Sequence, residues 1–271
     1  MSKFDLKPVL SVLGVIISCV GVLMLVPFLY AAFNAESTMV NLGLTSISLV
    51  LSGMVLYKLV PSKSKNLNKR QGYILVVTAW LGTAILSGLP YYFGGIGFDW
   101  SMAFFESMSG LTTTGATVIE DLERIPNSIL LWRSLTQWLG GMGIIVLTIA
   151  IFPLLGLGGV NLFSAESPGP TSIKLHPRIK ETAKRLWMIY VGLTLLLSLI
   201  LWLEGMTLFN AINHSLTTIA TGGFSTHNAS LGHYDSPLIQ YTVIIFMLVA
   251  GMNYSLIYLS LKGRFSKVLA S

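Results

Sequence analysis

The sequence has few charged residues and one cysteine. Only 10% of its 271 residues are charged, against about 25% in an ordinary soluble domain. Mean hydropathy is +0.73 and 53% of the residues are hydrophobic, which excludes an ordinary water-soluble fold because so much apolar surface needs a membrane as its solvent. Cys19 has no intrachain disulfide partner and no CxxC metal or redox motif. We expect Cys19 to be a filler that faces lipid or core.

Acidic residues are also scarce, since 11 Asp and Glu stand against 17 Lys and Arg. A basic balance can indicate nucleic-acid binding, but the chain has no RNP, zinc-finger or helix-turn-helix signature. It also lacks the GxSxG, HExxH and GxxxxGK motifs of enzymes. We therefore predict no catalytic residue, no cofactor on this chain and no nucleic-acid partner.

What the sequence does have is long apolar runs. A spanning helix needs about 20 mostly apolar residues, and the chain holds six such segments: 9–33, 39–60, 73–93, 128–155, 186–203 and 237–261. Two shorter stretches, 101–111 and 207–218, are rich in Ser, Thr and Gly and lie between full spans. Each crosses only about half of the bilayer core. The sequence predicts an all-α polytopic membrane protein with a retained first helix.

Basic residues predict the orientation. Of the 17 Lys and Arg, 15 lie on one side of these spans, and only Arg124 and Arg133 lie on the other. This bias predicts that both termini are cytoplasmic and that both half-length segments are external. The external loops would then carry six acids that either concentrate cations at a pore mouth or are simply solvated: Asp99, Glu120, Asp121, Glu123, Glu204 and Asp235.

The second half of the chain repeats the order of the first. A span, a short helix, a Thr/Gly-rich run and a second span occur twice, with Thr114-Gly115 aligned to Thr221-Gly222 and Glu106 aligned to Asn213. Residues 140–143 correspond to 250–253. We predict two helix–pore helix–filter–helix repeats preceded by two extra transmembrane helices. The predicted units are 1–71 (two-helix addition), 72–160 (first repeat), 161–185 (cytoplasmic loop) and 186–271 (second repeat).

The Thr/Gly-rich runs favour a cation. Extended backbone at membrane depth must be buried in protein or line a water-filled cavity, and carbonyl oxygens can replace the hydration shell of potassium. Glycine permits the positive φ that turns carbonyls toward one axis. The candidate filter residues are Thr112, Thr113, Thr114, Gly115, Ile219, Ala220, Thr221, Gly222 and Gly223. We expect potassium, as substrate, to bind the backbone carbonyls of Thr113, Thr114, Ala220 and Thr221.

Other polar residues have two interpretations each. Glu106 is an ion-ligand candidate because it is an acid inside the membrane, but hydrogen bonding to backbone behind the filter is favoured. His214 is favoured as a structural histidine over a proton relay. Metal binding by His227 and His233 is the less favoured interpretation of that loop. The Gly140, Gly141 and Gly143 cluster predicts close packing against a pore helix.

These motifs resemble the bacterial TrkH branch of the Trk/Ktr/HKT potassium transporter family. The resemblance covers nearly the whole chain, and it rests on the runs TTTGATV (112–118), GGMGI (140–144), AESPGP (165–170) and IATGGFSTH (219–227), with RI (178–179), TA (182–183) and LW (186–187). It implies multi-pass insertion in the bacterial inner membrane and one filter glycine from each repeat, here Gly115 and Gly222. Glycine at position 115, where sodium-transporting plant relatives have serine, implies potassium.

The resemblance also implies partners. These are membrane lipid, a second copy in a homodimer, and a cytoplasmic ring of TrkA-like nucleotide-binding regulatory subunits, for which the basic loop 174–185 is a plausible face. Members of this branch carry four repeats, whereas the sequence holds two. A shortened product of a longer protein and a natural half-length protein that pairs with itself or another chain both fit this count.

Three functional hypotheses remain from the sequence. The first is potassium uptake through a P-loop filter, although two filter segments cannot encircle an ion, so one isolated copy should not form a selective pore. The second is a non-conducting half or assembly scaffold. The third, less favoured, is a secondary transporter with broken helices at the midplane, which does not explain Thr-Gly runs after both half-helices.

Overall fold

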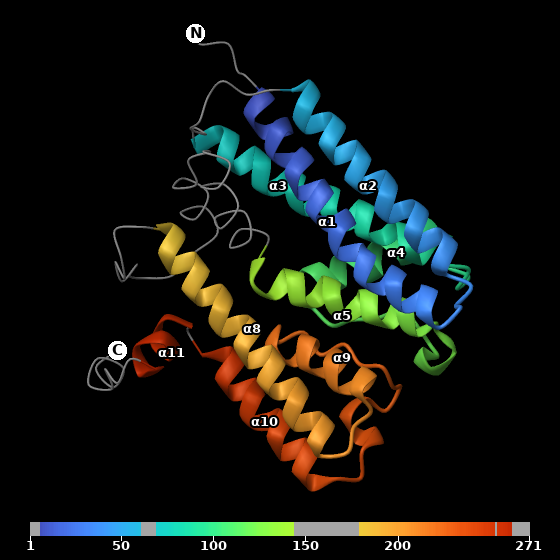
Figure 1. The fold of residues 1–271 in the computed structure, drawn as a ribbon, viewed down its shortest axis with the longest axis vertical. Helices are drawn as coiled ribbons and strands as arrows, with labels where there is room; N and C mark the ends of the chain where they lie inside the picture. Colours follow the sequence, from blue (N-terminus) through green and yellow to red (C-terminus); the bar gives the residue numbers. More distant parts are fainter. Residues whose placement is uncertain (1–5, 61–68, 144–178, 253, 262–271) are drawn as a thin grey trace.

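The computed structural model describes residues 6–60, 69–143, 179–252 and 254–261, and its regular elements there are all helical (Figure 1). The first part holds α1 (Lys7–Phe33), α2 (Met39–Leu59), α3 (Lys69–Phe93), α4 (Trp100–Leu111), the 3-10 turn η1 (Leu122–Arg124) and α5 (Asn127–Gly141). The second holds α8 (Ile179–Leu203), α9 (Leu208–Ile219), the 3-10 turn η2 (Ser230–His233), α10 (Pro237–Gly251) and α11 (Tyr254–Leu261). An all-helical fold is confirmed.

Within the described residues, four helices are long and apolar enough to cross a membrane: α1, α2, residues 71–93 of α3 and residues 184–203 of α8. Large apolar side chains on their outer faces are exposed, among them Leu29, Leu51 and Leu195, as expected where lipid is the solvent. The two predicted half-length segments are α4 and α9, with 12 residues each. At a rise of about 1.5 Å per residue, neither of them spans the hydrocarbon core.

Two predicted spans differ from the structure. The prediction of one helix over 237–261 is wrong, because α10 ends at Gly251, Met252 is extended (φ −76°, ψ 156°) and a separate helix begins at Tyr254. The span predicted over 128–155 begins as α5, which has 15 residues. The remainder of that prediction, from residue 144, lies outside the described residues.

The α1–α2 pair is joined by small residues. A side chain on Gly21 would meet the backbone of α2 at Val50 within 2.8 Å, and Ser46 donates to the Gly21 carbonyl at 2.8 Å. In a lipid environment the hydrophobic effect does not favour helix association, so helices associate through close backbone packing at small residues. The pair runs side by side along one flank of the molecule (Figure 1), and its α1 member also packs on α3 and α5.

Helix lengths repeat between the two halves. The short helices α4 and α9 have 12 residues each, and α5 and α10 have 15 each. The α5 and α10 helices end at Gly141 and Gly251, as the predicted pairing of 140–143 with 250–253 requires.

The two halves meet at α5. This helix packs against α4 of its own repeat and against α9 of the next, and 11 of its 15 residues are buried. It therefore has no lipid-facing side of the kind seen on α1 or α8. Both half-length helices, α4 and α9, therefore pack on the same helix.

Candidate functional site

Each short helix ends in the same C-terminal motif. In the first, the Thr113 N–H donates to the Gly110 carbonyl at 3.0 Å and the Thr114 N–H to the Ser109 carbonyl at 2.9 Å. In the second, Thr221 donates to Thr218 and Gly222 to Thr217, both at 2.9 Å. This pair of bonds is the Schellman motif, which requires a left-handed residue directly after the cap.

A threonine occupies that left-handed position in both segments. Thr113 and Thr221 each have φ of 54°, a conformation in which a β-branched residue is an outlier. Glycine is the usual residue there because it has no Cβ penalty. Strained backbone of this kind is concentrated at functional sites, and here it occurs twice at equivalent positions.

The sign of φ alternates along both segments. Thr112 (φ −81°) and Thr113 (φ 54°) precede Thr114, which is not left-handed, and Gly115 (φ 76°). Ala220 (φ −73°), Thr221 (φ 54°), Gly222 and Gly223 (φ 81°) repeat that order. Alternation turns successive peptide planes the same way, so N–H groups gather on one side and carbonyls on the other. The N–H groups face the pore helix, to which they donate.

The carbonyls on the other side meet no hydrogen-bond donor in the part of the chain that the structure describes. Within the described residues, no hydrogen bond reaches the backbone oxygen of Thr113, Thr114, Ala220 or Thr221. Backbone oxygens near protein are normally paired, and free ones are the groups that coordinate a dehydrated potassium ion.

The structure corrects the repeat alignment by one residue. The prediction paired Thr114-Gly115 with Thr221-Gly222, but the left-handed glycines are Gly115 and Gly223, and the left-handed threonines are Thr113 and Thr221. Thr114-Gly115 therefore corresponds to Gly222-Gly223. The same shift places His214, not Asn213, opposite Glu106. The backbone oxygens equivalent to those of Thr113 and Thr114 are those of Thr221 and Gly222.

The two segments touch at their glycines. A Cβ atom on Gly115 would overlap the carbonyl oxygen of Gly222, and one on Gly222 would overlap the amide of Gln137 on α5. The Gln137 Oε1 atom accepts the Phe224 N–H at 3.1 Å. A glycine is needed at Gly222 for this close approach and at Gly115 for both its φ and its space. Gly223, by contrast, has no atom within 4 Å of a Cβ position.

A buried ion pair lies behind the first segment. Glu106 on α4 and Arg133 on α5 are 0% and 1% exposed, and Arg133 Nε lies 2.7 Å from Glu106 Oε1. Glu106 also accepts from Thr117 Oγ1 at 3.0 Å and from the Val118 N–H at 3.1 Å. The favoured prediction for Glu106, hydrogen bonding to backbone behind the filter, is confirmed.

Arg133 also reaches the second repeat. Its Nη1 donates to the Ser225 carbonyl at 3.1 Å, and its guanidinium lies 4.0 Å from the centre of the Phe224 ring. The side of the membrane predicted for Arg133 stays a prediction, but Arg133 is buried between both repeats and is not an exposed loop charge. Because Arg133 Nη2 also donates to Thr117 Oγ1 at 3.3 Å, one side chain binds the segments that follow both candidate filter segments.

Sequence reasoning missed Arg133 and Gln137 as functional residues. Together with Gly140 and Gly141 they fall at positions i, i+4, i+7 and i+8 of α5, a single helical stripe. Gly140 faces the end of α4, since its Cβ would lie 2.6 Å from the Leu111 carbonyl carbon, and Gly141 faces Ala220 and Tyr190. The predicted packing of these glycines against a pore helix is confirmed. The sequence signal that could have identified Arg133 and Gln137 was their helical spacing with the glycine pair Gly140 and Gly141.

Comparison with known proteins decides the family. The family model described as "TrkH: Cation transport protein" matches residues 46–270. The chain belongs to the TrkH family. The chain is 42% identical over 264 residues to the Trk system potassium uptake protein TrkH of Escherichia coli K12, and 33% identical over 271 residues to TrkG of the same organism. These alignments cover 97% and 99% of this chain.

The fold agrees with this family. The crystal structure of the potassium transporter TrkH from Vibrio parahaemolyticus matches with a TM-score of 0.81 and 38% identity, over 96% of this chain and 53% of that chain. The chain spans 55% of the Escherichia coli TrkH sequence and 56% of TrkG. It is therefore similar to about half of each of these TrkH-family proteins.

Two predicted residues of the TrkH-family chain are structural in this arrangement. Asn213 donates to the Phe209 carbonyl at 2.8 Å, within its own helix. His214 is buried, and its Nε2 lies 3.5 Å from Thr226 Oγ1. The side-chain contact of His214 fits the favoured structural role, while Asn213 Oδ1 is buried and makes no hydrogen bond within the described residues.

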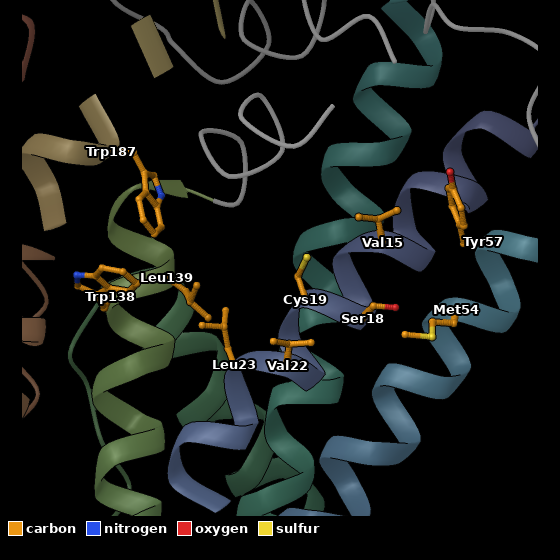
Figure 2. A pocket seen from close by; sticks show the side chains of 10 residues that line it. All are labelled: Val15, Ser18, Cys19, Val22, Leu23, Met54, Tyr57, Trp138, Leu139 and Trp187. Carbon is orange, nitrogen blue, oxygen red and sulfur yellow. The ribbon is translucent and has the colours of Figure 1, made fainter. Parts of the chain in front are cut away.

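A pocket of about 370 Å³ is lined by none of the candidate filter residues (Figure 2). It is lined by Val15, Ser18, Cys19, Val22, Leu23, Met54, Tyr57, Trp138, Leu139 and Trp187, and the view shows these side chains arriving from α1, α2, α5 and α8. Its lining is almost wholly apolar and offers a bare cation no ligand set. Cys19 faces this apolar space, so its predicted role as a filler is confirmed.

Replacing either left-handed threonine by glycine should relieve its backbone strain. We expect Thr113→Gly and Thr221→Gly each to raise the free energy of unfolding by about 0.5–1 kcal/mol, because the αL cost for a non-glycine residue exceeds the added entropy of the unfolded chain. We expect potassium selectivity to fall in the same variants, since the segment loses stiffness. Thr112→Gly is the matched control, because Thr112 has negative φ and its replacement should destabilise. Denaturation in detergent micelles measures all three, and equal effects in all three would contradict the interpretation.

Proposed function

We propose that this chain supplies two of the filter segments of a potassium-translocating subunit of TrkH type. One observation carries the proposal: two segments in different repeats have the same alternating φ and unpaired carbonyls, and they lie against each other at Gly115 and Gly222. The relatives are potassium uptake proteins by name. Backbone oxygens that replace a hydration shell are the chemistry that such uptake needs.

A complete pore needs further protein, and α10 has a surface for it. Gln137 and Gly141 of α5 face the second repeat, and the equivalent positions on α10 are Met247 and Gly251. Both are exposed. We infer that a further repeat, either from a longer chain or from a second copy of this one, packs on that face of α10 as α9 packs on α5.

We infer the cellular setting from charge. With 15 of 17 basic residues on one side of the spans, the chain would sit in the bacterial inner membrane with both termini in the cytoplasm. The basic segment 174–185 would then face a cytoplasmic nucleotide-binding regulatory partner. A homodimer is part of the same proposal.

Rubidium uptake into liposomes tests the function. The chain is reconstituted with the further repeats that complete the pore, either from a longer chain or from a second copy. We then expect rubidium uptake that potassium suppresses and sodium does not. Potassium-insensitive uptake would contradict a potassium filter. Capture of a cytoplasmic partner without any alkali-cation binding would favour the alternative of a non-conducting scaffold.

The filter glycines give a site-specific prediction. We expect Gly115→Ser and Gly223→Ser to reduce potassium-over-sodium selectivity at least about tenfold, or about 1.4 kcal/mol, because serine strains each left-handed position and adds a side chain beside the ion path. Gly82→Ser on α3 is the matched control, since its Cβ position is open and its φ is helical. Competition by sodium in the rubidium assay measures the change. Unchanged selectivity in both filter variants would remove the filter assignment.

A further inference from the structure

The loops that follow the two filter segments bring three metal-ligating side chains together. Glu123 belongs to η1 in the first loop, while His227 and His233 belong to the second loop. One ligand atom from each of the three lies within 4.8 Å of the other two. The candidate potassium filter needs none of these side chains, so the grouping has no explanation in the function proposed above.

Hydrogen bonds across the repeats hold the two loops in register. Asn228 Oδ1 accepts the Leu122 N–H at 2.9 Å, and Asn228 Nδ2 lies 3.3 Å from Asp121 Oδ1. These bonds fix the residues on either side of the cluster, Leu122 next to Glu123 and Asn228 next to His227. The hydrogen bonds between the loops therefore hold the Glu123 carboxylate and the His227 imidazole close together.

The histidine rings are placed by aromatic neighbours. The His227 and His233 rings stack with centroids 3.7 Å apart at 7°, and the Tyr234 ring lies edge-on to both. His227 Nδ1 is buried and makes no hydrogen bond within the described residues. It lies 3.9 Å from Glu123 Oε1, too far for a direct bond and slightly wider than the separation of about 3.3 Å between two ligand atoms of a tetrahedral zinc ion, so a small side-chain movement would let both atoms share an ion.

The other nitrogen of His227 has an adaptable partner. His227 Nε2 lies 3.1 Å from Asn210 Nδ2, and Asn210 Oδ1 accepts from the Thr226 hydroxyl at 3.0 Å. If the Asn210 amide turns over, its oxygen accepts the Nε2 proton and its nitrogen donates to the Thr226 oxygen. The tautomer with a free Nδ1 lone pair is then held by a hydrogen bond, as is usual for a metal-binding histidine.

We propose that Glu123, His227 and His233 form a site for a divalent transition-metal ion of the Zn²⁺ class. Two imidazoles and one carboxylate with water in the fourth position are a zinc ligand set, with tetrahedral geometry. The stacked rings must rotate about their Cβ–Cγ bonds to converge on one ion, and that torsion is broad for histidine. A bound ion would join the loops of the two repeats just beyond the candidate filter.

The test is zinc binding by the whole chain, prepared without a histidine tag and stripped of metal with a chelator. We expect one Zn²⁺ per chain in competition with a chromophoric chelator, and no displacement by Mg²⁺ or Ca²⁺, which prefer all-oxygen sites. His233→Gln and Glu123→Gln should each weaken binding at least about tenfold. Glu120→Gln, at an exposed carboxylate of the first loop that is not part of the cluster, is the matched control and should leave the affinity unchanged.

Because Glu123 and His233 are exposed, we expect both variants to keep the fold. Size-exclusion chromatography of each variant checks this. Absence of stoichiometric zinc binding by the native chain would overturn the proposal, and so would equal affinity in His233→Gln and the native chain. The readout involves no transport, so its failure and a failure of the potassium function are distinguishable.

Discussion

Replacement of Arg133 by methionine is expected to lower the free energy of unfolding by about 3–5 kcal/mol, the cost of leaving one charge of a buried pair uncompensated. Glu106 would remain buried, with only Thr117 and the Val118 N–H as partners. The Ser225 carbonyl and the Phe224 ring would also lose their guanidinium. Rubidium uptake should fall together with stability, because the segments that follow both candidate filter segments lose their shared contact with Arg133.

Two controls separate this effect from a general loss of charge. In the double variant Glu106→Gln/Arg133→Met, glutamine can still accept from Val118 and donate to Thr117, so most of the stability should return. Arg124→Met removes the ion pair with Asp121, which is exposed and should cost no more than about 1 kcal/mol. Denaturation in mixed micelles measures each variant. Equal losses for Arg133→Met and Arg124→Met would show that the buried pair has no special role.

The half-helices could be predicted because the bilayer sets a length. Stretches near 101–111 and 207–218 are too short to span, and the structure has α4 and α9 at Trp100–Leu111 and Leu208–Ile219. The break after Gly251 could not be read in the same way. Only Asn253 and Ser255 interrupt the apolar run before Leu256 and Ile257, so hydropathy alone continues the helix, whereas the backbone becomes extended at Met252.

The repeat register shows where residue identity misleads. Thr114-Gly115 and Thr221-Gly222 are the same dipeptide, but backbone conformation at a helix end depends on distance from the helix start. Asp99 and Thr207 are the N-caps, with side chains that accept from Met102 and Asn210. Both residues are of preferred N-cap types. Counting 12 helical residues from each cap places Thr113 opposite Thr221 and Gly115 opposite Gly223.

Arg133 illustrates a limit of charge counting. The positive-inside pattern treats each basic residue as a loop charge, and an arginine near the end of a predicted span is counted with the loop. Its partner Glu106 is 27 residues away in sequence, so only the packing of α4 on α5 brings the two charges together. Helical spacing of Arg133 with Gln137 and Gly140 was the available sign that this side chain faces protein.

Gly140→Ala is expected to destabilise the chain by about 1–3 kcal/mol through overpacking. A Cβ atom there would overlap the Leu111 carbonyl oxygen and lie 2.6 Å from its carbon, and backbone cannot move aside as a flexible side chain can. Leu111 is the last residue of α4 and Thr112 follows it directly. Displacement of α5 or α4 at this contact would therefore shift the first filter segment, so potassium selectivity should fall with stability.

Gly192→Ala on α8 is the matched variant for this prediction. Its Cβ position has no atom within 4 Å, so only the intrinsic preference of a helix for alanine acts there, worth up to about 1 kcal/mol in favour of the variant. The same preference acts at Gly140, and the difference between the two variants isolates the packing cost. If Gly140→Ala proved as stable as Gly192→Ala in micelle denaturation, with unchanged rubidium selectivity, α5 would not position the filter through this contact.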